Sequence, residues 1–202
     1  MSKLTPRQRR RQKTRQAILD TAQALISEKG PDGISIREIA RRIDYSPAGL
    51  YEYFDSKDDL VAAVCADGMK QLSVAFKQVP ADLPPTDCLV ELGLRYAEFA
   101  RCNPEQFLMI FNTLPSSRIS IDEPVDRDSP YYILLKTAQA AVEAGEFEAI
   151  GERAAEGIAY SLWALMHGRA MLELTFLRNF QSDFDPVHRW AMETFIKGLK
   201  AG

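Results

Sequence analysis

The sequence predicts an all-α protein, with a small helix–turn–helix domain followed by a larger helical domain. Apolar residues recur at helical spacing along the chain, and N-cap residues and Gly or Pro stops divide that pattern into separate helices. No turn dipeptide stands between alternating apolar and polar runs, which argues against β-hairpins. The 202 residues are enough for one large domain or two small ones.

The first two helices of the small domain have clear ends. One spans residues 14–29 and stops before Gly30, and residues 1–13 precede it as a basic arm. Ser35 and Glu38 have the spacing of a capping box that opens the second helix. The expected inward stripes of these helices are Ile18, Ala22, Leu25 and Ile26, and then Ile36, Ile39, Ala40 and Ile43.

A third helix of only two turns follows over residues 47–54, with a serine N-cap and a proline at its first position. A fourth helix, residues 56–79, connects the two domains, which we place at residues 14–60 and 61–202. Three prolines in the segment 80–85 end it.

The larger domain is expected to hold five more helices. On the helix over residues 86–102, the inward face is Leu89, Leu92, Tyr96 and Phe99. Residues 115–129 are predicted to form a polar loop. The other helices are expected over residues 104–112, 129–144, 151–177 and 186–200, with Gly145 as one of the stops.

The composition is that of an ordinary globular protein, with 46% apolar and 26% charged residues. No apolar run approaches the ~18 residues of a membrane-spanning helix, and no apolar segment follows the basic start as in a signal peptide. Cys65, Cys88 and Cys102 form no C-x-x-C pair, which is typical of reduced thiols. We therefore expect a cytoplasmic protein with no membrane partner, no metal and no cofactor.

Positive charge is concentrated at the start of the chain. Residues 1–60 carry 12 Lys and Arg against 9 Asp and Glu, whereas residues 61–202 carry 13 against 19. A basic head on an acidic body suggests that one end meets a polyanion, although a solvated tail would have the same composition. The cations that precede the first acid, Asp20, are Lys3, Arg7, Arg9, Arg10, Arg11, Lys13 and Arg15.

The two-turn helix has an unusual outer face. At about 100° per residue, Leu50 and Phe54 fall on one side and are expected in the core. Ala48, Gly49 and Glu52 fall opposite, with tyrosines on both flanks. By shape alone this could be a structural αα-hairpin. However, a helix that exposes Ala and Gly allows a close backbone approach, and the major groove of DNA admits such a helix.

Three stretches make residues 14–64 similar to the DNA-binding domain of the TetR family of bacterial regulators. They are Ala17-Ile18-Leu19-x-x-Ala22, Ser35-Ile36-Arg37-Glu38-Ile39-Ala40 and Leu50-Tyr51-x-Tyr53-Phe54-x-x-Lys57-x-x-Leu60. The resemblance implies that Tyr51 and Lys57 clamp phosphates and that Arg37 touches a phosphate or a base edge. It also implies base-facing positions at Pro47, Ala48, Gly49, Glu52 and Tyr53. We count Ser46, the N-cap before them, among the candidate DNA contacts as well.

The chain departs from the family pattern in the turn and in the recognition helix. Asp44 replaces a common Gly but tolerates the left-handed conformation, Tyr45 replaces a small residue and could project to phosphates, and Ala48 replaces a frequent Gly. Residues 47–54 contain no Arg, Lys, Asn or Gln, so bidentate contacts to guanine or adenine are not available.

These departures lead to a specific contact hypothesis. We expect Glu52 to accept a hydrogen bond from a cytosine amino group and Ala48 to touch a thymine methyl group. A solvated residue is the plain alternative for Glu52. The cationic contacts are then expected from Arg37 and from Arg10 and Arg11 of the arm, with the arm in a minor groove.

In the larger domain, Trp163-x-x-x-His167-Gly168 and Tyr96-x-x-Phe99-Ala100-x-x-x-Pro104 resemble a subgroup of the family with a W-x-x-x-H-G signature. Trp163 and His167 share one helix face. A single His without Cys or acidic partners at ligand spacing is a poor metal site, and a buried hydrogen-bonding His is the plainer interpretation.

The resemblance also implies a dimer interface on the last two helices and an effector pocket. The interface candidates are Ile158, Leu162, Leu165, Leu172, Trp190, Phe195 and Leu199, some of which could belong to an internal core. The candidates for an apolar pocket, each of which could equally be plain core, are Phe99, Phe107, Met109, Phe111, Tyr131, Tyr132, Trp163, Met166, His167 and Met171.

We therefore predict a ligand-responsive, homodimeric transcriptional regulator, a repressor. It is expected to bind a palindromic operator in double-stranded DNA and to be released by a small, largely apolar effector. An effector-independent or architectural DNA-binding protein is the alternative. A helical enzyme is disfavoured, because the sequence has no Gly-rich phosphate loop, H-E-x-x-H or G-x-S-x-G pattern, and His167 and His188 lie outside any nucleophile constellation.

Overall fold

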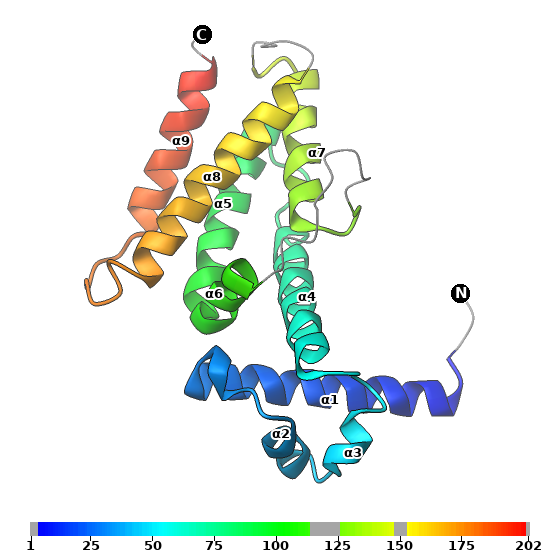
Figure 1. The fold of residues 1–202 in the computed structure, drawn as a ribbon. Helices are drawn as coiled ribbons and strands as arrows, with labels where there is room; N and C mark the ends of the chain where they lie inside the picture. Colours follow the sequence, from blue (N-terminus) through cyan, green and yellow to red (C-terminus); the bar gives the residue numbers. More distant parts are fainter. Residues whose placement is uncertain (1–3, 114–125, 148–152, 201–202) are drawn as a thin grey trace. The chain divides into compact units, whose positions relative to one another are not determined.

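The computed structural model describes residues 4–113, 126–147 and 153–200, and all regular structure in these ranges is helical (Figure 1). The all-α class is thus confirmed. The contacts divide the chain into two compact units: unit 1, residues 1–68 and 105–117, and unit 2, residues 69–104 and 118–202. None of the described helices is long and apolar enough to cross a bilayer.

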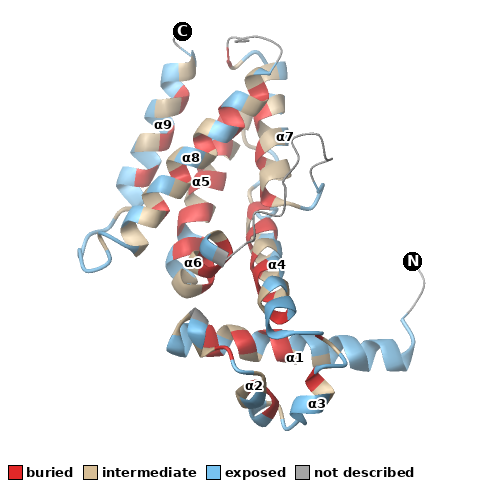
Figure 2. Ribbon diagram, viewed as in Figure 1, coloured by how far each residue is buried: buried red, intermediate tan, exposed pale blue. Residues whose placement is uncertain are grey.

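Unit 1 contains the helix–turn–helix. Its Leu50 and Phe54 are buried, as the helical periodicity predicts, and so are Ile39 and Ala40 (Figure 2). Its elements are α1 (Pro6–Lys29), the 3-10 helix η1 (Pro31–Gly33), α2 (Ile36–Arg42), α3 (Pro47–Leu50), the first part of α4 (Lys57–Phe76) and nearly all of α6 (Pro104–Thr113).

Helix α6 packs into unit 1, although the sequence analysis placed it in the larger domain. Gln23 of α1 donates from Nε2 to Oε1 of Gln106 at 2.9 Å. A Cβ at Gly68 of α4 would lie 2.7 Å from Cδ1 of Ile110 and 2.8 Å from Nε2 of Gln106. Gly68 therefore permits an approach of α4 to α6 that a larger residue would obstruct.

The helix expected from residue 14 begins at Pro6, so the prediction of an arm is wrong for residues 6–13. Thr5 and Gln8 form a capping box, in which Gln8 N donates to Thr5 Oγ1 and Thr5 N donates to Gln8 Oε1. The T-x-x-Q spacing before a basic run is a recognisable start signal. Apolar periodicity missed it, because these first turns are exposed on all sides.

The turn between α2 and α3 has a left-handed residue that is not glycine. Asp44 has φ 53°, the left-handed conformation that Asp tolerates. Helix α3 ends at Leu50, earlier than the predicted residue 54. The backbone continues in tight i→i+3 turns, with Tyr51 N bonded to Ala48 O at 3.2 Å and Tyr53 N bonded to Leu50 O at 2.9 Å. The recognition element is thus one α-helical turn followed by tight turns.

Unit 2 is organised around α5 (Pro85–Cys102), which packs against α7 (Pro130–Glu143), α8 (Ala154–Leu174) and α9 (Asp185–Lys200). The inward face predicted for α5 is confirmed, because all four of its residues are buried. Gly145, the stop predicted for α7, follows this helix and has a left-handed φ of 71°. The loop predicted for residues 115–129 lies mostly outside the described residues.

Candidate nucleic-acid interface and effector site

The outer side of the recognition element is small, partly apolar and exposed. Ala48 and Glu52 are exposed, and Tyr51 is 53% exposed. Gly49 differs from the expectation, because the ring of Tyr45 covers it: a Cβ at Gly49 would lie 2.5 Å from Cε1 of Tyr45. The absence of a side chain at Gly49 therefore leaves room for the Tyr45 ring. Ala48 and Glu52 remain as the side chains that can meet base edges.

Ser46, included among the candidate DNA contacts, caps α3. Its Oγ accepts a hydrogen bond from Gly49 N at 2.9 Å, which satisfies one of the free N–H groups at the start of the helix. The sequence predicts this N-cap, and Pro47 stands at the first helical position. Both residues therefore fix the entry angle of the recognition element.

The tyrosine flank of the recognition element is held by α1. Tyr45 and Tyr53 meet edge to face with ring centroids 6.3 Å apart, and the hydrogen bond between them raises the pKa of Tyr45. The Arg11 guanidinium lies 5.6 Å from the centre of the Tyr53 ring, and its Nη2 donates to the carbonyl oxygen of Glu52 at 3.0 Å. Sequence reasoning missed this support, because it joins residues 41 positions apart.

The cations of unit 1 differ in whether they have a partner within the unit. Arg41 and Arg42 bind carboxylates, and their hydrogen bonds to Glu38 lower the pKa of that carboxyl group to about 2. In contrast, three exposed cations predicted as DNA contacts have neither a carboxylate nor an aromatic partner among the described residues. These cations, which can still take a phosphate, are Arg10, Arg37 and Lys57.

The ten pocket candidates are divided between the units. Phe107, Met109 and Phe111 lie on α6 in unit 1, where Phe107 and Met109 are buried and the rings of Phe107 and Phe111 are 4.8 Å apart. Neither unit alone brings all ten together. Those in unit 2 are Phe99, Tyr131, Tyr132, Trp163, Met166, His167 and Met171.

The W-x-x-x-H pattern has a physical counterpart in unit 2. The hydroxyl of buried Tyr96 lies 2.8 Å from Nδ1 of His167, which stands four residues after Trp163. Burial raises the pKa of Tyr96 and lowers the pKa of His167, which keeps both groups neutral. This hydrogen bond is a polar anchor inside an apolar domain.

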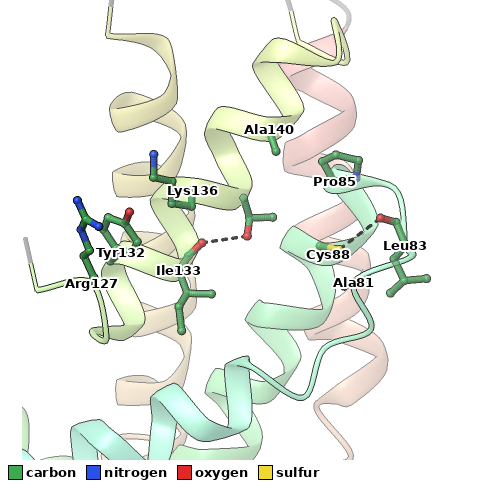
Figure 3. A pocket seen from close by; sticks show the side chains of 10 residues that line it. Ala81, Leu83, Pro85, Cys88, Arg127, Tyr132, Ile133, Lys136 and Ala140 are labelled. Carbon is green, nitrogen blue, oxygen red and sulfur yellow. Dashed lines mark hydrogen bonds between the residues drawn. The ribbon is translucent and has the colours of Figure 1, made fainter. Parts of the chain in front are cut away.

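An open groove of about 400 Å³ lies on unit 2 (Figure 3). One wall is formed by α7 and the other by Cys88 of α5 and the segment that precedes it. Tyr132 is the one pocket candidate that lines this groove, and Nζ of Lys136 lies 5.7 Å from the centre of its ring. The full lining is Ala81, Leu83, Pro85, Cys88, Arg127, Tyr132, Ile133, Lys136, Thr137 and Ala140.

The interface candidates on α8 and α9 separate into buried and exposed residues. Ile158 and Leu162 are buried within unit 2, which favours the alternative left open for some of these residues, an internal core. Leu165, Phe195 and Leu199 are half-buried. Leu172 is 52% and Trp190 is 65% exposed. Sequence reasoning missed four other exposed apolar residues: Tyr160, Phe176, Phe180 and Val187.

The two sides of α8 explain this division. One i, i+4 stripe is buried: Ile158, Leu162, Met166 and Ala170. A second stripe, two residues out of phase and so on the opposite side, is exposed: Tyr160, Ala164, Gly168, Leu172 and, just past the helix, Phe176. A helix that is apolar on both sides is normally covered on both sides.

Buried His188 joins α9 to α8 and leads to a prediction of pH dependence. Its Nδ1 accepts from Nε of Arg169 at 2.9 Å, and its Nε2 lies against the Glu173 carboxylate. Burial lowers the pKa of His188, although Glu173 opposes this effect. Because the unfolded chain binds the proton more readily, the free energy of unfolding of unit 2 should fall as pH drops below about 6.5 and level off below the folded pKa.

Both tryptophans lie in unit 2, so urea unfolding followed by tryptophan fluorescence at about pH 7.5 and about pH 5.5 measures this loss. The His188→Gln variant should lose less stability between these pH values, and His167, whose pKa burial also lowers, accounts for a remaining part. An unchanged pH dependence in the variant would contradict the assignment to His188.

Two family profiles match the chain. The profile described as "Bacterial regulatory proteins, tetR family" matches residues 18–64, and the one described as "Tetracyclin repressor-like, C-terminal domain" matches residues 89–195. Neither description names the W-x-x-x-H-G subgroup, so that assignment stays a prediction.

Curated relatives match part of the chain. An uncharacterized HTH-type transcriptional regulator of Mycobacterium tuberculosis is 36% identical over 93 residues, which are 46% of this chain and 44% of that protein. An HTH-type transcriptional repressor of the same species is 36% identical over 74 residues, which are 36% of this chain and 39% of that protein. The chain thus spans less than half the length of these relatives.

Solved structures match nearly the whole chain. A protein of unknown function from Rhodococcus sp. RHA1 has a TM-score of 0.77 at 22% identity, with 92% of this chain and 95% of that chain covered. A regulatory protein in the tetR family from Rhodococcus RHA1 has a TM-score of 0.65 at 19% identity, with 92% and 96% covered. These likenesses show the fold, and the two profiles show the family. The chain belongs to the TetR family of bacterial transcriptional regulators.

Proposed function

We propose that this protein is a ligand-responsive dimeric repressor that binds a palindromic operator through its helix–turn–helix and is released by a small, largely apolar effector. The observation that carries the proposal is the recognition element, which buries Leu50 and Phe54 and exposes Ala48 and Glu52. Around it stand exposed Tyr51 and the unpaired cations of unit 1. This arrangement can hold phosphates while a narrow helix enters a major groove.

The exposed stripe of α8 and exposed Trp190 of α9 support a dimer. A recognition element of one helical turn reaches few base pairs, and two copies on a two-fold axis reach successive major grooves about 34 Å apart. The groove and the Tyr96–His167 anchor support effector binding in unit 2, because ligand sites combine apolar walls with a few oriented polar groups. An effector releases DNA to the extent that it prefers one of two states of the dimer.

The proposal is tested with the purified protein. A duplex selected by the protein from a random-sequence library should contain an inverted repeat, and its binding should weaken with salt. A small-molecule screen by thermal shift should then yield compounds that release this duplex. Failure to select any preferred duplex contradicts the regulator assignment, and selection without any releasing compound favours the effector-independent alternative.

Glu52 provides a prediction about base preference. Glu52→Ala should weaken binding to the selected duplex by about 1–3 kcal/mol and relax the preference for one C·G pair, because the cytosine amino group loses its acceptor. Glu52→Gln should move the preference at that pair towards adenine, since Gln binds adenine in bidentate fashion. Binding of each variant to duplexes with all four base pairs at that position measures this. If neither affinity nor preference changes, Glu52 is a solvated bystander.

A further inference from the structure

The first turns of α1 form an unpaired basic surface. Arg7, Arg9 and Arg10 are exposed, and none of them has an acidic partner among the described residues. The first turn of α1 contains no acid. Cations at a helix N-terminus oppose the helix dipole, and like charges four residues apart repel. The isolated chain therefore bears an electrostatic cost here that a bound polyanion would remove.

This basic surface is attached to the recognition element within unit 1. Arg11 donates to the Glu52 carbonyl oxygen and lies over the Tyr53 ring, and one turn further the Arg15 guanidinium lies 5.0 Å from the centre of the Phe54 ring. The α1 helix is continuous from Pro6 through these contacts, and its N-terminal turns extend beyond α3 (Figure 1). These contacts thus hold the basic turns of α1 in a fixed position relative to the recognition element.

The helical periodicity selects Arg7 among these cations. Arg7, Arg11 and Arg15 are spaced by four residues and share one side of α1. Arg11 and Arg15 on this side contact the recognition element. Arg7 therefore lies on the same side of α1, one turn further towards the N-terminus and beyond these contacts. Lys13, about 240° from Arg7 at 100° per residue, lies well away from this stripe.

The helical form of residues 6–13 argues against their insertion into the minor groove, the contact expected of an arm. An α-helix with its side chains is about 10–12 Å across, whereas the minor groove of B-DNA is about 6 Å wide. The sugar–phosphate backbone beside the half-site is accessible to such a helix. Residues 6–13 span about 12 Å at 1.5 Å per residue, comparable to the rise of about three base pairs at 3.4 Å each.

We infer that the N-terminal turns of α1, with Arg7 foremost, bind the phosphate backbone that flanks each operator half-site. The inference rests on the proposed function, and it adds a sequence-independent contact that extends the footprint outward. Such a contact raises affinity for every duplex and makes binding more sensitive to salt, because each phosphate that is neutralised releases counterions.

The test compares Arg7→Gln with Lys13→Gln, which makes the same charge change on another side of the same helix. Affinity for the duplex selected by the wild type is measured over a salt series. The slope of log Kobs against log[salt] should be shallower by about 0.9 per bound subunit for Arg7→Gln, and nearly unchanged for Lys13→Gln. The affinity loss should be the same for A·T and G·C flanks, and both thermal midpoints should match the wild type.

Each contrary result has a distinct meaning. Equal slopes for the two variants would overturn the contact, because net charge alone would then account for the loss. A loss confined to A·T flanks would show a minor-groove contact instead. If the wild type selects no duplex at all, the proposed function fails and this inference fails with it. If the wild type binds its duplex while Arg7→Gln keeps the full slope, this inference alone fails.

Discussion

Replacing Trp190 with glutamate is expected to convert a dimer into a monomer and to weaken operator binding by orders of magnitude. Trp190 is 65% exposed, and Phe176, beside the exposed stripe of α8, is 86% exposed. An aromatic residue at the centre of an interface is the type that contributes 2 kcal/mol or more to association. A buried, unpaired carboxylate adds a desolvation penalty. A monomer then binds one half-site and loses the contribution of the second.

Sedimentation and gel-shift titration with the selected duplex measure the two effects. Val74→Glu is the matched control, because it introduces the same charge at an exposed apolar residue of α4, away from α8 and α9. It should stay dimeric. Since Trp190 is exposed, the variant monomer should keep its helical content. A Trp190→Glu protein that remains a dimer would place the interface elsewhere, and a monomeric wild type would contradict the dimer itself.

Replacing Phe54 with alanine should destabilise unit 1 by about 3–5 kcal/mol, the usual cost of removing a buried phenylalanine side chain. Phe54 is buried at the end of the recognition element, and Arg15 of α1 lies over its ring. The cavity therefore opens where the recognition element meets α1. The variant should lose specific DNA binding because its recognition element is no longer held in position.

Urea unfolding distinguishes the units. Both tryptophans lie in unit 2, so Phe54→Ala should shift the transition seen by far-UV circular dichroism more than that seen by tryptophan fluorescence. Tyr51→Ala is the control from the same turn. Its side chain is exposed, so stability should change by no more than about 0.5 kcal/mol, while DNA affinity falls through loss of the phosphate contact. A Phe54→Ala protein of wild-type stability would contradict the packing.

Local rules predicted the parts of the interface that depend on short stretches of chain. The angle of 100° per residue separates Leu50 and Phe54 from Ala48 and Glu52 within eight positions. The side chains of Ser46 and Asp44 act on their own backbone, so the cap and the left-handed turn follow from residue type. The start of α1 was also present in the sequence, as Thr5 and Gln8, but its first turns have no apolar stripe to reveal a helix.

Contacts between distant positions could not be predicted in this way. Arg11 was assigned to DNA, and the structure shows it holding Glu52 and Tyr53, because which side of α1 meets the recognition element depends on how the helices pack. Tyr45 covers Gly49 for the same reason. The polar anchor joins Tyr96 of α5 to His167 of α8, 71 positions away.

By itself, the sequence determined the all-helical class and the helix–turn–helix with its exposed side, because caps, stops and periodicity act over a few residues. The family resemblance came from the motifs between Ala17 and Leu60. The tertiary structure decided which apolar residues face inward. Helix α8 is apolar on two opposite sides, and periodicity treats Leu162 and Leu172 alike. Packing against α5 and α7 buries the stripe that holds Leu162 and leaves the stripe with Leu172 exposed. Burial therefore depends on which helices pack against each side, and periodicity within one helix does not contain that information.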